Sequence, residues 1–227
     1  MELVYVDRRQ AGRELAVALR RLTLEQPVIV LGLPRGGVPV AAEVATALGA
    51  PLDVLTVRKV GAPLNPEFAL GAIATGGVVV RDDSAGWFLG GDAQEFERLA
   101  ERERAELRRR EAAYRSGRGP LDLRDRSVVL VDDGLATGST MVAAVRAARA
   151  AGAARIVAAA PVGSAEAVNR LEGEADDVVV PLVPRSLRSV GEWYDEFGQV
   201  DDETVRALLR RAGSGAAAGA ARGGAAR

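Results

Sequence analysis

Cysteine and histidine are both absent from this sequence of 227 residues. Without cysteine the chain can form no disulfide, no thiolate metal site and no cysteine nucleophile. Without histidine it can form no serine–histidine triad and no imidazole metal site, and it lacks the commonest general base. Several common kinds of active site are therefore excluded before any motif is considered.

Long apolar segments and a strong net charge are missing as well. The N-terminal stretch MELVYVDRRQAGREL contains no apolar core of a signal peptide, and no stretch reaches the roughly 18 to 20 apolar residues that cross a bilayer. The formal net charge is -1, which provides no overall basic field for nucleic acid. We therefore expect a cytoplasmic protein with no nucleic-acid or membrane partner, and we leave a homodimer open.

Lysine is nearly missing too. Of the 30 basic residues, Lys59 is the one lysine and the rest are arginine. Codon bias in a GC-rich genome is the favoured explanation of this imbalance, and the excess of alanine and glycine agrees with it. A compact ammonium and a planar guanidinium are nevertheless not interchangeable at a binding site. Lys59 is therefore a candidate functional residue.

The sequence does contain a regular alternation of strand and helix patterns. Short continuous apolar runs, which are typical of strands buried on both faces, fall at 27–33, 51–57, 127–133, 154–162 and 176–183. Helical patterns lie before or between them, at 8–22, 38–49, 138–152 and 164–173. This order predicts an α/β fold with a doubly wound, mostly parallel sheet and helices on both faces.

An insertion separates the second and third of these strands. Residues 68–83 have the pattern of a β-hairpin around Gly76 and Gly77. Residues 92–117 have the pattern of a highly charged helix that faces solvent or a partner. The last residues, 213–227, form a low-complexity tail that is too poor in large apolar groups to fold, so we expect it to be disordered.

The segment VVLVDDGLATGST, residues 128–140, places two acids directly before a turn suited to an anion. The turn Thr-Gly-Ser-Thr, residues 137–140, would direct N–H groups and hydroxyls outward at the positive end of a helix. An ordinary capped helix is the alternative, because Ser and Thr are favoured N-caps. Asp132 and Asp133 favour a ligand, since they end an apolar strand, where open α/β sheets bind theirs. A ribose would place its diol on the acids and its 5'-phosphate on the turn.

A second turn repeats this design. GLPRGGVPVA, residues 32–41, joins a strand to a helix and carries Arg35 at its apex, where a guanidinium could hold another anion through two hydrogen bonds. Alone this is a weak signal, because Gly-Gly turns are common. Together the two turns describe a ligand with phosphate at both ends and a diol between them, and phosphoribosyl pyrophosphate is such a molecule.

The motifs resemble those of a known family. VVLVDDGLATGSTM closely resembles the phosphoribosyl-pyrophosphate-binding motif of the type I phosphoribosyltransferases. LPRGG resembles that family's pyrophosphate loop, which usually contains a non-proline cis peptide, here expected near Pro34 and Arg35. VRKVGAP, residues 57–63, resembles the Arg-Lys segment that opens the flexible catalytic loop of adenine-type members. The resemblance covers about 28–183.

The resemblance implies one domain over residues 1–212, with a variable hood from 1–27 and 184–212. It implies Mg²⁺-dependent transfer of the 5-phosphoribosyl group from phosphoribosyl pyrophosphate to a nitrogenous, nucleobase-like acceptor, with release of pyrophosphate. The Mg²⁺ would arrive mostly with the substrate, near the paired acids, and would need no direct protein ligand. The implied catalytic residues are Arg35, Arg58, Lys59, Asp132 and Asp133, and the implied substrate-binding residues are Gly36, Gly37, Ala136, Thr137, Gly138, Ser139 and Thr140.

Ala136 departs from one branch of the family. The 6-oxopurine enzymes usually carry an aspartate there as the base toward the purine, so Ala136 favours an adenine-like or orotate-like branch, or an acceptor that is not a purine. Glu67 is then a candidate acid or base on the flexible loop, with a solvated turn acid as the alternative. Trp193, Tyr194 and Phe197 could stack on a heterocycle, but packing over the sheet edge and the final helix is favoured.

Two other classes of function compete with an enzyme of this family. A regulatory protein could bind phosphoribosyl pyrophosphate or a nucleotide without turnover, although retention of Arg35, Arg58 and Lys59 favours catalysis. An aspartate phosphatase requires Asp-x-Asp, and a P-loop ATPase requires Gly-Lys before Ser/Thr. Neither pattern is present around residues 128–140.

Overall fold

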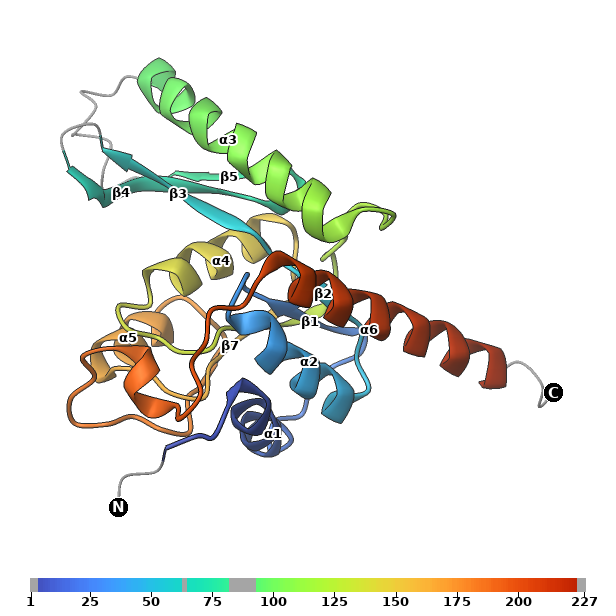
Figure 1. Cartoon of the computed structure of the whole chain (residues 1–227). Coiled ribbons are helices and arrows are strands. Elements are labelled where there is room, and N and C mark those ends of the chain that lie inside the picture. The colour runs from blue at the N-terminus through green and yellow to red at the C-terminus, as the bar shows by residue number, and fades with distance from the viewer. Residues whose placement is uncertain (1–3, 63–64, 82–92, 224–227) are drawn as a thin grey trace.

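The computed structural model describes residues 4–62, 65–81 and 93–223 (Figure 1). Its centre is a five-stranded parallel sheet in the order β2-β1-β6-β7-β8. The strands are β1 (Val28–Gly32), β2 (Leu52–Val54), β6 (Ser127–Val131), β7 (Arg155–Ala159) and β8 (Asp177–Val179). Each apolar run that the sequence predicted as a strand contributes one, which confirms the predicted α/β fold.

Helices cover both faces of this sheet. Helices α1 (Arg8–Leu19), α2 (Gly37–Leu48) and α6 (Asp202–Gly223) pack on one face, and α4 (Ser139–Ala150) and α5 (Ala165–Glu172) on the other. Side chains of successive strand residues point to opposite faces of the sheet. Val129 and Val131 belong to the core cluster under α1 and α2, whereas Val128 and Leu130 belong to the cluster under α4. Because both faces are buried, the strands have to be apolar without alternation.

The switch point of the sheet lies between β1 and β6, which are hydrogen-bonded neighbours with Gly32 level with Val131. After β1 the chain continues to β2 on one side of the sheet, and after β6 it continues to β7 and β8 on the other. The helices that follow β1 and β6 therefore leave on opposite faces. Such a point opens a crevice at the carboxyl ends of the strands, where sheets of this type bind ligands.

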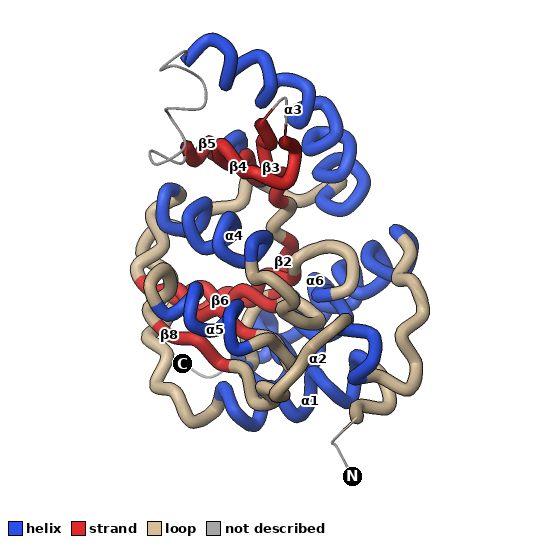
Figure 2. Tube along the Cα trace, turned by 90° about the vertical axis from the view of Figure 1, so that its left-hand side faces the viewer, coloured by secondary structure: helices blue, strands red, loops and turns tan. Residues whose placement is uncertain are grey.

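A smaller antiparallel sheet lies between α4 and α3 (Ala93–Arg115) (Figure 2). It consists of β3 (Val57–Ala62), β4 (Asn65–Ala74) and β5 (Val78–Arg81). The predicted hairpin is confirmed, since β4 and β5 are joined by a short 3-10 turn, η1 (Thr75–Gly77), in which Gly76 and Gly77 both have positive φ. Helix α3 packs Phe96, Ala100 and Leu107 in the core cluster of this sheet, and its exposed side carries ladders of Arg–Glu pairs.

The predicted flexible loop around Glu67 is wrong, because the backbone at this position belongs to the strand β4. The segment 57–63, which the resemblance places at the opening of that loop, instead forms β3 over Val57–Ala62 and pairs with β4. Local sequence gives little warning of this pairing, because the partner strand supplies the hydrogen bonds and a half-buried edge needs few apolar residues. The side chain of Glu67 lies outside the described residues, so its predicted acid or base role stays a prediction.

The two ends of the chain meet beside the main sheet. Tyr5 bridges to Tyr194, and a small core forms from Tyr5, Ala11, Val162, Trp193 and Tyr194. The predicted packing role is thus confirmed for Trp193 and Tyr194, although their partner is the N-terminal segment, whereas Phe197 stays 36% exposed. The final helix, α6, instead buries Val205 and Leu209 in the cluster shared with α1 and α2.

Helix α6 differs from the sequence prediction at its end. It continues to Gly223, past residue 212, where composition predicted a disordered tail. Alanine has the highest helix propensity, so an Ala-rich stretch can extend a helix that is already nucleated by packing. Within the described ranges, no helix is long and apolar enough to cross a membrane.

Candidate functional site

The phosphate loop, defined here as residues 136–140, begins shortly after β6 ends and carries the chain into α4. The N-cap of α4 is Gly138, with φ of 71°, a left-handed conformation that glycine adopts without strain. Glycine has no side chain with which to cap the helix. The hydroxyls of Thr137 and Ser139 lie 3.1 Å apart, and the Ser139 N–H makes a long 3.4 Å contact with the Thr137 hydroxyl. This is not an ordinary Ser/Thr cap, and it leaves N–H groups of the first turn available to an anion.

Asp132 and Asp133 follow β6 directly and lie at the switch point. The Asp133 backbone N–H donates to Asp132 Oδ1 at 2.9 Å. Burial raises the pKa of both carboxyls, and at Asp132 the neighbouring negative charge of Asp133 raises the pKa further. The two acids therefore hold more negative charge than their surroundings neutralise, and a ligand that donates hydrogen bonds or brings a cation would relieve this.

Arg8 is a site residue that the sequence analysis missed. Its Nε donates to Asp133 Oδ2 at 2.8 Å, and its Nη1 donates to the Gly198 carbonyl at 2.9 Å. Its guanidinium carbon lies 3.9 Å from the ring centroid of Phe197, a cation–π distance. Arg8 begins α1, far from the motif in sequence, and one arginine among many near a helix start gives no local signal of this role.

The aromatics of the predicted hood fall into different environments. The Tyr194 hydroxyl donates to the Asp133 backbone carbonyl at 2.6 Å, so it supports the acidic turn directly. Trp193 is buried in the cluster around Tyr5. Phe197 is one-third exposed, at 36%, and lines a cavity of about 350 Å³ together with Arg8, Arg35, Gly36, Asp133, Gln199 and Val200.

The pyrophosphate loop suggested by LPRGG faces the acids across the switch point. Its Pro34–Arg35 peptide bond is cis, as the resemblance led us to expect. An added Cβ at Gly36 would collide with the Asp133 carboxylate, and one at Gly37 would come within 2.5 Å of the Val131 carbonyl. The two glycines therefore allow this loop to lie directly against the acidic turn. Arg35 lies 3.7 Å from Asp202 at the start of α6.

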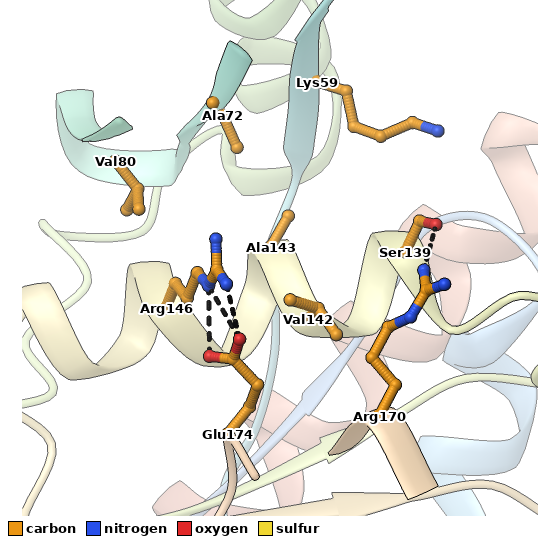
Figure 3. Close-up of a pocket in the computed structure, with 10 residues that line it drawn as sticks. Lys59, Ala72, Val80, Ser139, Val142, Ala143, Arg146, Arg170 and Glu174 are labelled. Atoms are coloured by element: carbon orange, nitrogen blue, oxygen red, sulfur yellow. Dashed lines mark hydrogen bonds and ion pairs between the residues drawn. The ribbon is translucent and has the colours of Figure 1, made fainter. Parts of the chain in front are cut away.

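The members of the predicted Arg-Lys pair have different surroundings on β3. Arg58 forms an ion pair with Glu103 of α3 at 2.7 Å, so its guanidinium is held by the charged helix. Lys59 lines a cavity of about 270 Å³ between the small sheet and α4, which also includes Ser139 (Figure 3). Arg58 would have to leave Glu103 to act as a pyrophosphate ligand. Lys59 shares its cavity with Ser139 of the phosphate loop, whereas Arg35 of the pyrophosphate loop lines a different cavity.

Together these residues place three kinds of chemical group at the carboxyl ends of β1 and β6. One end carries the N-terminus of α4 and the hydroxyls of the phosphate loop, the middle carries the paired acids, and the other side carries the Gly36–Gly37 turn with Arg35. Within the described part of the chain there is no cluster of acids or other ligands that could hold a metal ion by itself. This order of groups suits an anion, a group rich in hydroxyls and a second anion.

Comparisons with known proteins agree with this geometry. Residues 6–194 match the family model described as phosphoribosyl transferase domain. A protein of Mycobacterium tuberculosis H37Rv, Rv0571c, which is provisionally named a phosphoribosyl transferase, is 46% identical over 92% of this chain. The chain spans about half of that relative, 47% of its length. The crystal structure of TT1426 from Thermus thermophilus is 50% identical, with a TM-score of 0.85 over 92% of this chain and 98% of that one.

Proposed function

This chain belongs to the phosphoribosyl transferase family, and we propose that it transfers the 5-phosphoribosyl group of phosphoribosyl pyrophosphate to a nitrogenous, nucleobase-like acceptor. Pyrophosphate is the leaving group. The observation that carries the proposal is the placement of Asp132 and Asp133 between two turns suited to anions, at the switch point of the sheet. A ribose with phosphate at both ends matches that order of groups.

In this proposal each turn holds one end of the donor. Backbone N–H groups and hydroxyls of residues 136–140 bind the 5'-phosphate at the positive end of α4. Asp132 and Asp133 accept hydrogen bonds from the ribose hydroxyls and stabilise positive charge that develops on the sugar ring as pyrophosphate departs. Arg35 lies on the pyrophosphate loop, and Arg58 and Lys59 are the further pyrophosphate ligands that the family resemblance implies.

The acids also fit a Mg²⁺ ion carried by the substrate. Both carboxyls have raised pKa values, so the site favours an added cation, and the described residues offer no complete cage of acids. Mg²⁺ retains several waters and commonly binds one or two carboxylates together with substrate phosphates. When bound, the ion would neutralise charge on the pyrophosphate. Asp132 and Asp133 are the residues that would lie beside it.

The acceptor is proposed to enter the 350 Å³ cavity next to Asp133. Phe197 provides an aromatic face, and Arg8, Gln199 and Asp133 provide donors and acceptors of hydrogen bonds around it. Ala136 has no carboxylate with which to deprotonate a purine, so we favour an acceptor of the adenine-like or orotate-like kind over a 6-oxopurine. The acceptor must share the space over Phe197 with the Arg8 guanidinium.

A sensor that binds the donor without turnover is the second candidate, and one assay separates the two. The protein is incubated with phosphoribosyl pyrophosphate, Mg²⁺ and a panel of bases and amines, and pyrophosphate release is measured. Release that depends on one acceptor supports the enzyme. Tight donor binding with no release for any acceptor would support the sensor, and absence of donor binding would refute both.

A further inference from the structure

Helix α5 lies along the back of the phosphate loop and contacts it at intervals of one helical turn. The Ser164 hydroxyl, at the N-cap of α5, donates to the Ala136 carbonyl at 2.7 Å. An added Cβ at Gly138 would lie only 3.2 Å from Ala167, so loop and helix pass too closely there for a side chain to fit without a shift. Arg170 Nη1 donates to the Ser139 hydroxyl at 3.2 Å. Residues three apart share one face of a helix, so a single face of α5 serves the loop.

Arg170 determines whether the Ser139 hydroxyl donates or accepts hydrogen bonds. A guanidinium has five donors and no acceptor, so the Ser139 oxygen must accept the hydrogen bond from Arg170. The Ser139 proton is then left to be donated. The Thr137 hydroxyl lies 3.1 Å away in this structure, and a phosphate oxygen in the loop would compete for the same proton. Arg170 thus orients a donor toward the place where an anion would bind.

The charge around Arg170 is only partly neutralised. Its acidic partner is Glu166, at 3.1 Å, and both side chains are well exposed, at 44% and 74%. A pair of this kind is screened by water and leaves the guanidinium able to contact another group. Figure 3 shows the Ser139 hydroxyl between the ends of Arg170 and Lys59, which line the same cavity. Arg146, further along that cavity, is bound to Glu174.

We propose that Arg170 is a positioning residue for the 5'-phosphate of the donor. It orients the Ser139 hydroxyl as a hydrogen-bond donor and adds positive charge behind the phosphate loop. This inference rests on the proposed function, because it assumes that the loop binds a phosphate. It adds a side chain from α5, outside the sequence motif, to the binding of one end of the donor and predicts no effect at the pyrophosphate end.

The test compares two variants that break the same surface ion pair. Arg170→Gln removes the charge and the fixed donor to Ser139, whereas Glu166→Gln leaves Arg170 in place without its acid. Binding of ribose 5-phosphate, pyrophosphate and phosphoribosyl pyrophosphate is measured calorimetrically with Mg²⁺, and thermal melting monitors folding. We expect Arg170→Gln to weaken binding of ribose 5-phosphate and of the full donor about tenfold, the scale of one charge-assisted hydrogen bond. Pyrophosphate binding should be unchanged.

Glu166→Gln should leave ribose 5-phosphate binding unchanged or tighter, because it removes a competing negative charge. Arg170→Lys should restore part of the affinity by restoring the charge. In turnover, Arg170→Gln should raise KM for the donor while kcat stays close to the native value. Equal weakening by Arg170→Gln and Glu166→Gln would overturn the inference in favour of a purely structural pair, as would equal weakening for pyrophosphate. If native protein bound none of the three ligands, the proposed function itself would fail.

Discussion

The buried acids Asp132 and Asp133 lower the stability of the folded chain at neutral pH. Their folded-state pKa values are raised, so the folded chain binds protons more tightly than the unfolded chain. The stability from that protonation is present at low pH and is lost as pH rises from the ordinary aspartate range through the raised values. At neutral pH the chain without ligand therefore carries an unfavourable concentration of charge.

Asp132→Asn should accordingly raise the free energy of unfolding at neutral pH, because it removes a buried negative charge beside Asp133. Asparagine keeps an oxygen that can accept from the Asp133 N–H. Under the proposed function, the same change should weaken donor binding by at least tenfold, because the proposed ribose contact and the charge beside the proposed Mg²⁺ would be lost. Urea unfolding between pH 4 and 8, with calorimetry of the donor, would measure both; a gain that did not grow with pH would contradict the charge argument.

Arg8 holds the pKa of Asp133 lower than burial alone would leave it. Arg8→Ala should therefore raise the pKa of Asp133 further and move the pH dependence of donor binding to higher pH. Arg9→Ala is the matched control, because Arg9 is the next residue of α1 and pairs with Glu43 at an exposed site. Donor affinity measured across pH 5 to 8 should shift for the first variant alone. An identical profile for both variants would remove Arg8 from the site.

At the scale of elements, the two loops at the switch point can lie close to their neighbours because each contains glycines, which have no side chain. Gly36 and Gly37 bring one loop against the acids, and Gly138 brings the phosphate loop against α5. The order of strands brings the loops together, since β1 and β6 are neighbours although β2, the small sheet and α3 lie between them in the sequence. The motifs indicated each loop from its own residues, and the pairing of β1 with β6 places the two loops side by side.

Gly36→Ala should disrupt this junction, because the new Cβ would overlap the Asp133 carboxylate. We expect loss of the Arg8–Asp133 contact, donor binding weakened by at least tenfold and destabilisation of about 1 to 3 kcal/mol, as for other overpacked sites. Gly119→Ala is the control, since nothing lies within 4 Å of an added Cβ there. Thermal melting and donor titration would be compared. Donor affinity equal to that of the control would mean that the loop moves aside without consequence.

At the scale of the whole molecule, the site depends on contacts between the ends of the chain. The Tyr5 N–H donates to the Trp193 carbonyl at 2.9 Å, and the Tyr5 hydroxyl donates to the Pro161 carbonyl at 3.0 Å. Arg8 and Tyr194, which follow Tyr5 and Trp193 in the chain, both reach Asp133. The small cluster around Tyr5 thus holds both segments that complete the acidic turn.

Trp193→Ala should cost about 3 to 5 kcal/mol, the usual cost of emptying a buried aromatic site, and should lower the melting temperature markedly. Val17→Ala, at a side chain that is 60% exposed, should change stability little. Donor affinity of the folded fraction of the Trp193 variant should decrease only modestly, because Trp193 packs in the cluster around Tyr5 and supports the acids only through its neighbours. Native-like stability of Trp193→Ala would show that the cluster does not hold the two ends together.

The sequence by itself determined the class of fold and the two turns proposed to bind anions, because apolar runs without alternation, Gly-containing turns and adjacent acids are local patterns with direct physical causes. It did not predict β3, Arg8 or Arg170, and it placed Glu67 in a loop. Each of the first three depends on a partner distant in the chain: β4 for β3, Asp133 for Arg8 and Ser139 for Arg170. The residue type of a side chain on a helix surface does not indicate which group it will contact once the helices have packed on the sheet. Only the tertiary structure therefore added Arg8 and Arg170 to the candidate site, beside Arg35 and Arg58, which the motifs indicated.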